Sequence, residues 1–169
     1  MAAGPTHTSG DPIEEARRQW DQRWPGGAAM TAATSIMRAQ QIVQASVDEA
    51  LKPFDLSFAR YEALVLLAFT RRGSLPMGKM GERLMIHPTS VTNIVDRLER
   101  QGFVRRQPHE RDRRTTMVEI TQAGREVVER ATKEVVASSF GLEGLSEGQL
   151  GQVAALVHEV RAHSGDLSR

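Results

Sequence analysis

The chain has 169 residues, of which 40% are hydrophobic and 25% charged, and its net charge is +1. These values are typical of one globular domain with an extension, large enough to bury a core without disulfides. The absence of cysteine excludes disulfides, thiolate zinc sites and cysteine nucleophiles. The longest apolar run, 63–69, is too short to cross a bilayer, and the first residues lack a signal-peptide pattern, so we expect a cytoplasmic protein with no membrane partner.

The N-terminal third predicts two helices after a disordered start. Residues 1–11 are small and polar, which favours disorder. A short helix over 12–24 has Asp11 as its cap and a proline at its first position, and it ends at a Pro-Gly-Gly sequence. A longer helix over 30–51 carries an apolar stripe, and Pro53 stops it.

Three further helices are expected before any strand. Ser57 can cap a helix over 58–70, which is so apolar that it must lie in the core. A short helix follows over 77–84. After a break, Pro88 suits the first position of a helix that runs to Gln101 and stops at Gly102.

The helix over 88–101 has two distinct faces. At 100° per residue, the apolar side chains form one narrow stripe of Val91, Ile94, Val95 and Leu98. Small polar and charged side chains fall on the opposite side or beside it, namely Thr89, Ser90, Asn93, Asp96, Arg97 and Arg100. This helix therefore packs one face on the core and presents hydrogen-bonding groups on the other.

Two strands are predicted after Gly102, over 103–107 and 115–120, and the polar loop Pro108–Arg114 joins them into a projecting hairpin. Between 97 and 114 there are seven arginines, three acids and no lysine. Arginine offers a fixed fork of donors suited to phosphates and guanine edges. An exposed cluster with helical ion pairs is the alternative interpretation.

The C-terminal third predicts two more helices. Thr121 can cap a helix that runs to about Ser139, and a turn region follows. Ser146 and Gln149 form a capping box that opens a last helix to about His163. Its apolar stripe consists of Leu150, Val153, Ala154, Val157 and Val160.

The order helix, turn, helix, hairpin is that of a winged helix-turn-helix, in which the second helix enters the major groove. We predict a mainly α fold with a small β-hairpin wing that binds double-stranded DNA. The expected contacts are His87, Thr89, Ser90, Thr92, Asn93 and Arg97 from the helix, and Arg111, Arg113 and Arg114 from the wing.

Three other functions would leave different patterns in the sequence. A non-specific architectural DNA-binding protein would show diffuse lysine, and a winged-helix protein-interaction module would show apolar residues on the polar face of 88–101. No catalytic, cofactor-binding or metal-binding motif is present; His158 and His163 are five residues apart and point in different directions on a helix. We therefore expect no enzyme, no metal and no cofactor.

Residues 84–121 resemble the MarR family of transcriptional regulators. The stretch Val91-Thr-Asn-Ile-Val-Asp-Arg-Leu-Glu-Arg-Gln-Gly-Phe-Val-Arg-Arg106 is similar to the recognition helix and the start of the wing. Asp112-Arg-Arg114 and Val118-Glu-Ile-Thr-Gln-Ala-Gly124 are similar to the wing motif and the next helix. The resemblance implies an interlaced homodimer that reads an inverted-repeat operator, with Asp112 holding one of the wing arginines. It also implies a repressor that a small aromatic or lipophilic anion releases.

The ligand site of such a regulator is expected near the junction of the dimer helices and the DNA-binding domain, lined by residues 36–44 and 58–64, with Tyr61 and Arg38 as polar contacts. The extension with Trp20 is similar to that of a urate-responsive branch, whose site includes a tryptophan, a carboxylate and two arginines. Glu62 and Arg38 lie in the right region without completing that pattern. The alternative is that the tryptophans pack the extension on the dimer.

This interpretation divides the chain into five segments. They are a disordered N-terminus (1–11), a helical extension (12–29), a dimerisation helix (30–55), the winged helix-turn-helix domain (56–121) and C-terminal dimerisation helices (122–169).

Overall fold

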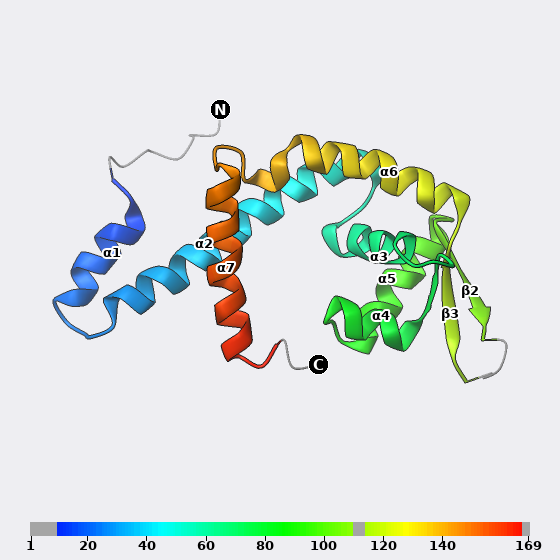
Figure 1. Ribbon diagram of the computed structural model, residues 1–169, viewed down its shortest axis with the longest axis horizontal. Coiled ribbons are helices and arrows are strands. Elements are labelled where there is room, and N and C mark those ends of the chain that lie inside the picture. Colours follow the sequence, from blue (N-terminus) through cyan, green and yellow to red (C-terminus); the bar gives the residue numbers. More distant parts are fainter. Residues whose placement is uncertain (1–9, 110–113, 167–169) are drawn as a thin grey trace, which may run out of the picture.

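The structure is a computed structural model that describes residues 10–109 and 114–166 (Figure 1). Its helices are α1 (Pro12–Asp21), α2 (Gly27–Leu51), α3 (Phe58–Ala68), α4 (Met77–Leu84), α5 (Pro88–Arg100), α6 (Gln122–Ala137) and α7 (Glu147–His163). Two single-turn 3-10 helices are η1 (Lys52–Phe54) and η2 (Ser139–Gly141). The strands are β1 (Ser74–Pro76), β2 (Val104–Pro108) and β3 (Thr116–Ile120). The predicted fold class is confirmed: the chain is mainly helical with a small wing.

Helix starts follow the predicted caps at most places. The side chains of Asp11 and Thr121 accept hydrogen bonds from the first turns of α1 and α6, and Ser146 forms the full capping box of α7. Ser57 lies at the start of α3, but its side chain makes no capping bond. The carboxylate of Asp48 accepts instead from the Phe58 amide at 3.2 Å, because the end of α2 lies beside the start of α3.

The sheet has three antiparallel strands in the order β1-β3-β2, one more than the hairpin that the sequence predicts. Leu75 pairs with Val118, and Val104 pairs with Ile120. β1 was not predicted, because its three residues, which end in proline, are too few to show the alternating pattern of a strand. The pairing of β1 with β3 nevertheless attaches the segment between α3 and α4 to the wing.

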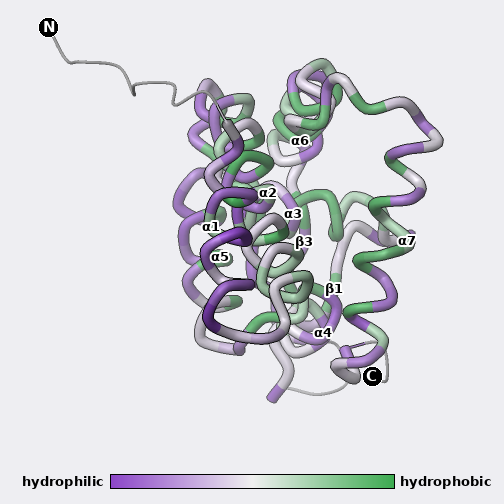
Figure 2. Tube along the Cα trace, turned by 90° about the vertical axis from the view of Figure 1, so that its left-hand side faces the viewer, coloured by the Kyte–Doolittle hydropathy of each residue, from purple (hydrophilic) through white to green (hydrophobic). Residues whose placement is uncertain are grey.

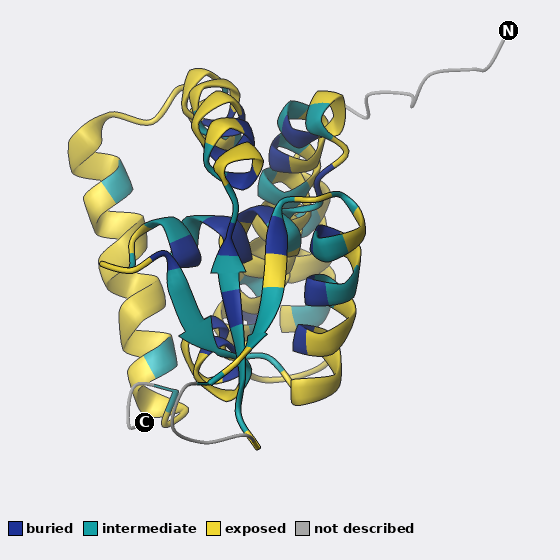
Figure 3. Cartoon of the chain, turned by 90° about the vertical axis from the view of Figure 1, so that its right-hand side faces the viewer, coloured by how far each residue is buried: buried dark blue, intermediate teal, exposed yellow. Residues whose placement is uncertain are grey.

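The core lies where α3 meets α5, α6 and the sheet, as the apolar sequence of α3 predicts. Its fully buried side chains include Leu64, Leu67, Val95, Leu98 and Val118. In Figure 3 the buried residues cluster behind the sheet and on the facing sides of these helices. The C-terminal half of α2 joins the core through Val47 and Leu51. This packing leaves the polar face of α5 outside the core.

The N-terminal half of α2 and the whole of α7 lie outside the core. α1 packs on α2, while α7 has no buried residue and extends away from the end of α6 (Figure 1). Hydrophobic residues nevertheless recur along α7, as Figure 2 shows. Across the described ranges, no helix combines the length and the apolar character that crossing a bilayer requires.

Candidate nucleic-acid interface

The turn between α4 and α5 positions the start of α5. Met85 takes a left-handed conformation (φ 54°), and its amide donates to the Gly81 carbonyl to end α4. His87 then caps α5, because its Nδ1 accepts from the Thr89 amide at 3.2 Å. An accepting Nδ1 carries no proton, so in the neutral imidazole the proton is on Nε2. The exposed His87 ring therefore has a donor available beside the first turn of α5.

The solvent face of α5 is the one that the sequence predicts. Thr89, Ser90, Thr92, Asn93 and Arg97 are exposed or half-buried, while the opposite face of the helix is buried. Within the described part of the chain, the side chains of Ser90, Asn93 and Arg97 have no hydrogen-bond partner. Thr92 donates to the Pro88 carbonyl at 3.2 Å. The face thus offers donors and acceptors to an external partner.

Asp96 was predicted on this face, but it is half-buried and faces the wing. Its carboxylate accepts from Nη2 of Arg106 on β2. Glu99 accepts from Arg106 Nη1 at 2.6 Å and from the Arg106 amide at 3.0 Å. Burial lowers the pKa of Arg106, but its bonds to Asp96 and Glu99 outweigh burial and the net pKa is raised. Arg106 therefore links the wing to α5 through ion pairs with both acids.

The arginine cluster accordingly divides by position. Arg105 pairs with Glu119 at 3.0 Å, and Arg100 donates from Nε to the Asp96 carbonyl. Like these two, Arg97 and Arg114 are exposed; Arg97 lies on α5, and Arg114 lies on the wing, where the His109 amide donates to the Thr115 carbonyl at 3.1 Å. Two of the predicted wing contacts, Arg111 and Arg113, lie outside the described residues, and so does Asp112, which was expected to hold one of the wing arginines.

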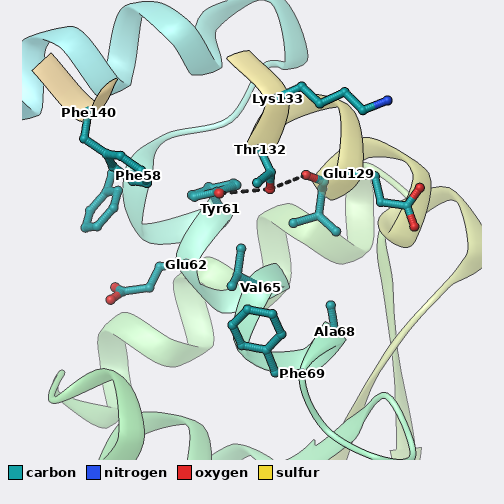
Figure 4. A pocket seen from close by; sticks show the side chains of 11 residues that line it. Phe58, Tyr61, Glu62, Val65, Ala68, Phe69, Glu129, Thr132, Lys133 and Phe140 are labelled. Atoms are coloured by element: carbon teal, nitrogen blue, oxygen red, sulfur yellow. Dashed lines mark hydrogen bonds between the residues drawn. The ribbon is translucent and has the colours of Figure 1, made fainter. Parts of the chain in front are cut away.

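A cavity of about 660 Å³ lies between α3 and α6 (Figure 4). Tyr61 lines it, as predicted, and its hydroxyl lies 2.9 Å from Thr132 Oγ1. The second wall was expected on residues 36–44, whereas it comes from Val128, Glu129, Thr132 and Lys133 of α6, with Phe140 beyond it. The spacing of these residues places them on one face of α6, but the sequence does not indicate which helix that face packs against.

Arg38 and Trp20 do not line this cavity. Arg38 donates to Gln41 on the exposed part of α2, roughly 20 Å along the helix axis from Leu51, where α2 joins the core. Trp20 packs edge-on against Trp24, and its Nε1 donates to the Pro25 carbonyl at 2.9 Å. Both tryptophans therefore shape the turn between α1 and α2 within the protomer.

Glu62 is the acidic residue at the mouth of the cavity on the α3 side. Burial raises the pKa of its carboxyl group, and within the described part of the chain no cation or donor pairs with it. Elsewhere in the described ranges, no group of three or more histidine, aspartate or glutamate side chains is arranged to hold a metal ion.

A second apolar groove of about 700 Å³ lies between α2 and α7. Its walls include Ile36 of α2 and Val153, Leu156, Val157 and Val160 of α7, all exposed. Exposed apolar side chains of this kind form a surface that another chain can bury.

Known proteins are similar to this chain in sequence and in fold. The sequence profile of the MarR family matches residues 57–116. The HTH-type transcriptional regulator YhbI of Bacillus subtilis is 32% identical over 92 residues, which cover 54% of this chain and 58% of that relative.

Two solved structures of Streptomyces coelicolor regulators share the fold. Sco5413, a MarR family transcriptional regulator, is 51% identical, with a TM-score of 0.77; the match covers 84% of this chain and 99% of that one. Sco3205, of the same family and solved in complex with DNA, is 25% identical, with a TM-score of 0.74 and coverage of 87% and 92%.

Proposed function

The chain belongs to the MarR family of transcriptional regulators, and on this premise we propose that it binds operator DNA as a homodimer and represses transcription until a small lipophilic ligand releases it. It is a regulator of the helix-turn-helix type and not an enzyme. The observation that carries the proposal is the exposed polar face of α5, whose Ser90, Asn93 and Arg97 side chains are unpaired within the described residues.

We assign two kinds of DNA contact to the DNA-binding head, residues 56–121. The first turns of α5 carry Thr89, Ser90, Thr92 and Asn93, where a recognition helix meets base edges, and Arg97 follows one turn later. His87 can donate from Nε2 to a phosphate. Arg114 and the wing arginines Arg111 and Arg113 would contact phosphates or a narrow minor groove. DNA bound to Sco3205 supports this assignment by analogy.

The homodimer is proposed from the groove between α2 and α7. Its apolar side chains are exposed in one protomer, and a second copy related by two-fold symmetry would bury them. We propose the same division of the chain as the sequence predicts. The segments are the helical extension 12–29, the dimerisation helix 30–55, the DNA-binding domain 56–121 and the C-terminal dimerisation helices 122–169. Two heads related by a two-fold axis would read an inverted repeat.

The ligand site is proposed in the cavity between α3 and α6. α3 belongs to the core of the head, whereas α6 continues through η2 towards α7. A ligand that wedges between the two helices can change their relative position, and it releases DNA if it binds the altered arrangement more tightly.

The test of the proposed function is binding to DNA from upstream of the chain's own gene, measured by fluorescence anisotropy. We expect binding that survives an excess of random duplex. Equal affinity for both DNAs would favour the architectural alternative, and no affinity for either would favour a protein-interaction module. The exposed polar face of α5 argues against that module, which needs apolar side chains there.

A further inference from the structure

The cavity between α3 and α6 has walls that are apolar and rich in aromatic rings. Phe58, Tyr61 and Val65 come from α3, Phe69 follows its last turn, and Phe140 of η2 lies beside Phe58 (Figure 4). Its volume of about 660 Å³ is within the range of small-molecule sites. Aromatic faces carry negative charge density and attract cations. The walls therefore favour a lipophilic ligand, and they tolerate a positive charge on it.

The buried hydroxyl of Tyr61 on the wall can only accept a hydrogen bond from a ligand, because its own proton is already used. Thr132 donates its hydroxyl proton to the Val128 carbonyl at 2.7 Å. The 2.9 Å contact between Thr132 and Tyr61 must then use the Tyr61 proton, with Thr132 as acceptor. The Tyr61 oxygen keeps an unused lone pair but has no further proton to donate, so a ligand that meets it must bring a donor.

The charged groups at the mouth of the cavity also favour a positively charged ligand. Glu62 and Glu129 are acids, and Glu62 has no cationic partner within the described residues. Among the described lining residues, Lys133 carries the single positive charge, and in Figure 4 its side chain extends away from Tyr61 and Glu62. A carboxylate ligand near Glu62 would be repelled by the like charge of Glu62. It would also find hydrogen-bond acceptors there and no donor.

We propose that the cavity selects a lipophilic ligand with a protonated amine, which pairs with Glu62 while its apolar body fills the space among the aromatic rings. The proposal rests on the proposed function, because it takes this cavity as the ligand site, and it names the class of ligand. The Tyr61 oxygen can accept a hydrogen bond from a donor elsewhere on the ligand. Glu62 is then the residue that determines specificity for a cation over an anion.

The experiment compares three probes that share one ring system: naphthylmethylammonium, naphthylmethanol and naphthoate. Calorimetry on the full chain is expected to rank their affinities in that order. Glu62→Gln should weaken the ammonium probe by about tenfold and leave the alcohol nearly unchanged. Glu134→Gln, on the same helix as the opposite wall but outside the cavity, is the matched control and should change none of the three.

The outcomes separate the ligand class from the proposed function. Naphthoate binding as tightly as the ammonium probe, or equal losses of both in Glu62→Gln, overturns the proposal, and so does failure of all three probes to bind. DNA release is measured separately, by anisotropy on the upstream DNA. If the ammonium probe binds through Glu62 without weakening DNA affinity, the ligand class stands and the ligand-controlled repression fails.

Discussion

The exposed side chains of the DNA-binding head differ in how much sequence information they can carry. The amide of Asn93 can bond an adenine edge with a donor and an acceptor at once, which discriminates between bases. The guanidinium of Arg114 on the wing is suited to phosphates, which are the same at every base pair. Substitutions at the two positions should therefore have different effects on operator and random DNA.

Asn93→Ala is expected to weaken operator binding by about 1–3 kcal/mol and to leave random DNA nearly unaffected. The reason is that alanine removes the base contact and keeps every phosphate contact. Titrations of both DNAs by anisotropy at one salt concentration measure the difference. An equal loss on both DNAs would mean that Asn93 does not read bases.

Arg114→Ala is expected to weaken binding to all DNA and to lower the salt slope by about 0.9, because the variant neutralises one phosphate fewer. Affinities at several salt concentrations give this slope. Arg105→Ala on β2 serves as the comparison, because Arg105 lies outside the predicted DNA contacts and its guanidinium is held by Glu119. Equal slopes for the wild type and Arg114→Ala would remove Arg114 from the phosphate contacts.

Glu62 gives the fold a small pH dependence, because its side chain is desolvated in part but remains exposed to solvent. Burial raises its pKa in the folded chain above the ordinary value for a glutamate, so the folded state holds the proton more tightly than the unfolded state. The free energy of unfolding contributed by Glu62 therefore falls as pH rises from the unfolded pKa through the raised one. Glu129 and Lys133 face the same cavity from α6.

Glu62→Gln should accordingly raise the melting temperature at neutral pH, and the gain should shrink as pH falls towards 4. Thermal melts at a series of pH values check this, with Glu134→Gln as the control that should show no such trend. A gain that stays the same at every pH would show that the charge of Glu62 is not its cause.

At the scale of elements, Gly124 holds the start of α6 against the wing. A Cβ at this position would lie 2.1 Å from the Phe103 carbonyl oxygen, which itself accepts from the Thr121 amide. Gly124→Ala is therefore expected to destabilise the fold by about 1–3 kcal/mol, measured by urea unfolding.

Gly78→Ala is the matched control, because a Cβ at Gly78 of α4 has no atom within 4 Å. We expect it to be neutral or to stabilise the helix by about 0.5–1 kcal/mol. Equal destabilisation by both substitutions would contradict the close packing of α6 on the wing.

Elements with a local signal could be predicted from the sequence. The faces of α5 follow from the helical period, so Val91, Val95 and Leu98 are buried as expected. The capping box of α7 and the stop at Gly102, with φ 74°, are encoded within a few residues. These features depend on neighbours in the chain and not on the rest of the fold.

Features that join distant segments could not be predicted in the same way. Asp96 has the period of the solvent face, and only the position of β2 brings Arg106 to it. The α6 wall of the cavity depends on how two helices pack, and no local pattern reports that. The left-handed conformations of Met85 and Phe140 also have no glycine in the sequence to signal them.

At the scale of the whole molecule, α7 has an apolar face and no core of its own within the protomer. Leu156 is 65% exposed and lines the groove with α2. Leu156→Glu is therefore expected to raise the dimer dissociation constant by at least about tenfold, because it would bury an unpaired charge at the interface.

Analytical ultracentrifugation over a range of concentrations measures this change, with Gln152→Glu on the part of α7 outside the groove as the control. A wild-type chain that sediments as a folded monomer at micromolar concentration would contradict the dimer. So would a Leu156→Glu chain that dimerises as tightly as the wild type.

The bond of Arg106 to Asp96 and Glu99 makes the proposed dimer sensitive to the length of DNA between its two half-sites. Because the wing and α5 are fastened together, a head has little internal freedom with which to follow a displaced half-site. One inserted base pair turns a half-site by roughly 35° about the DNA axis. A pair of rigid heads would then bind two half-sites only at one distance and one angle along the duplex. An operator with the correct bases at another spacing would bind no more tightly than random DNA.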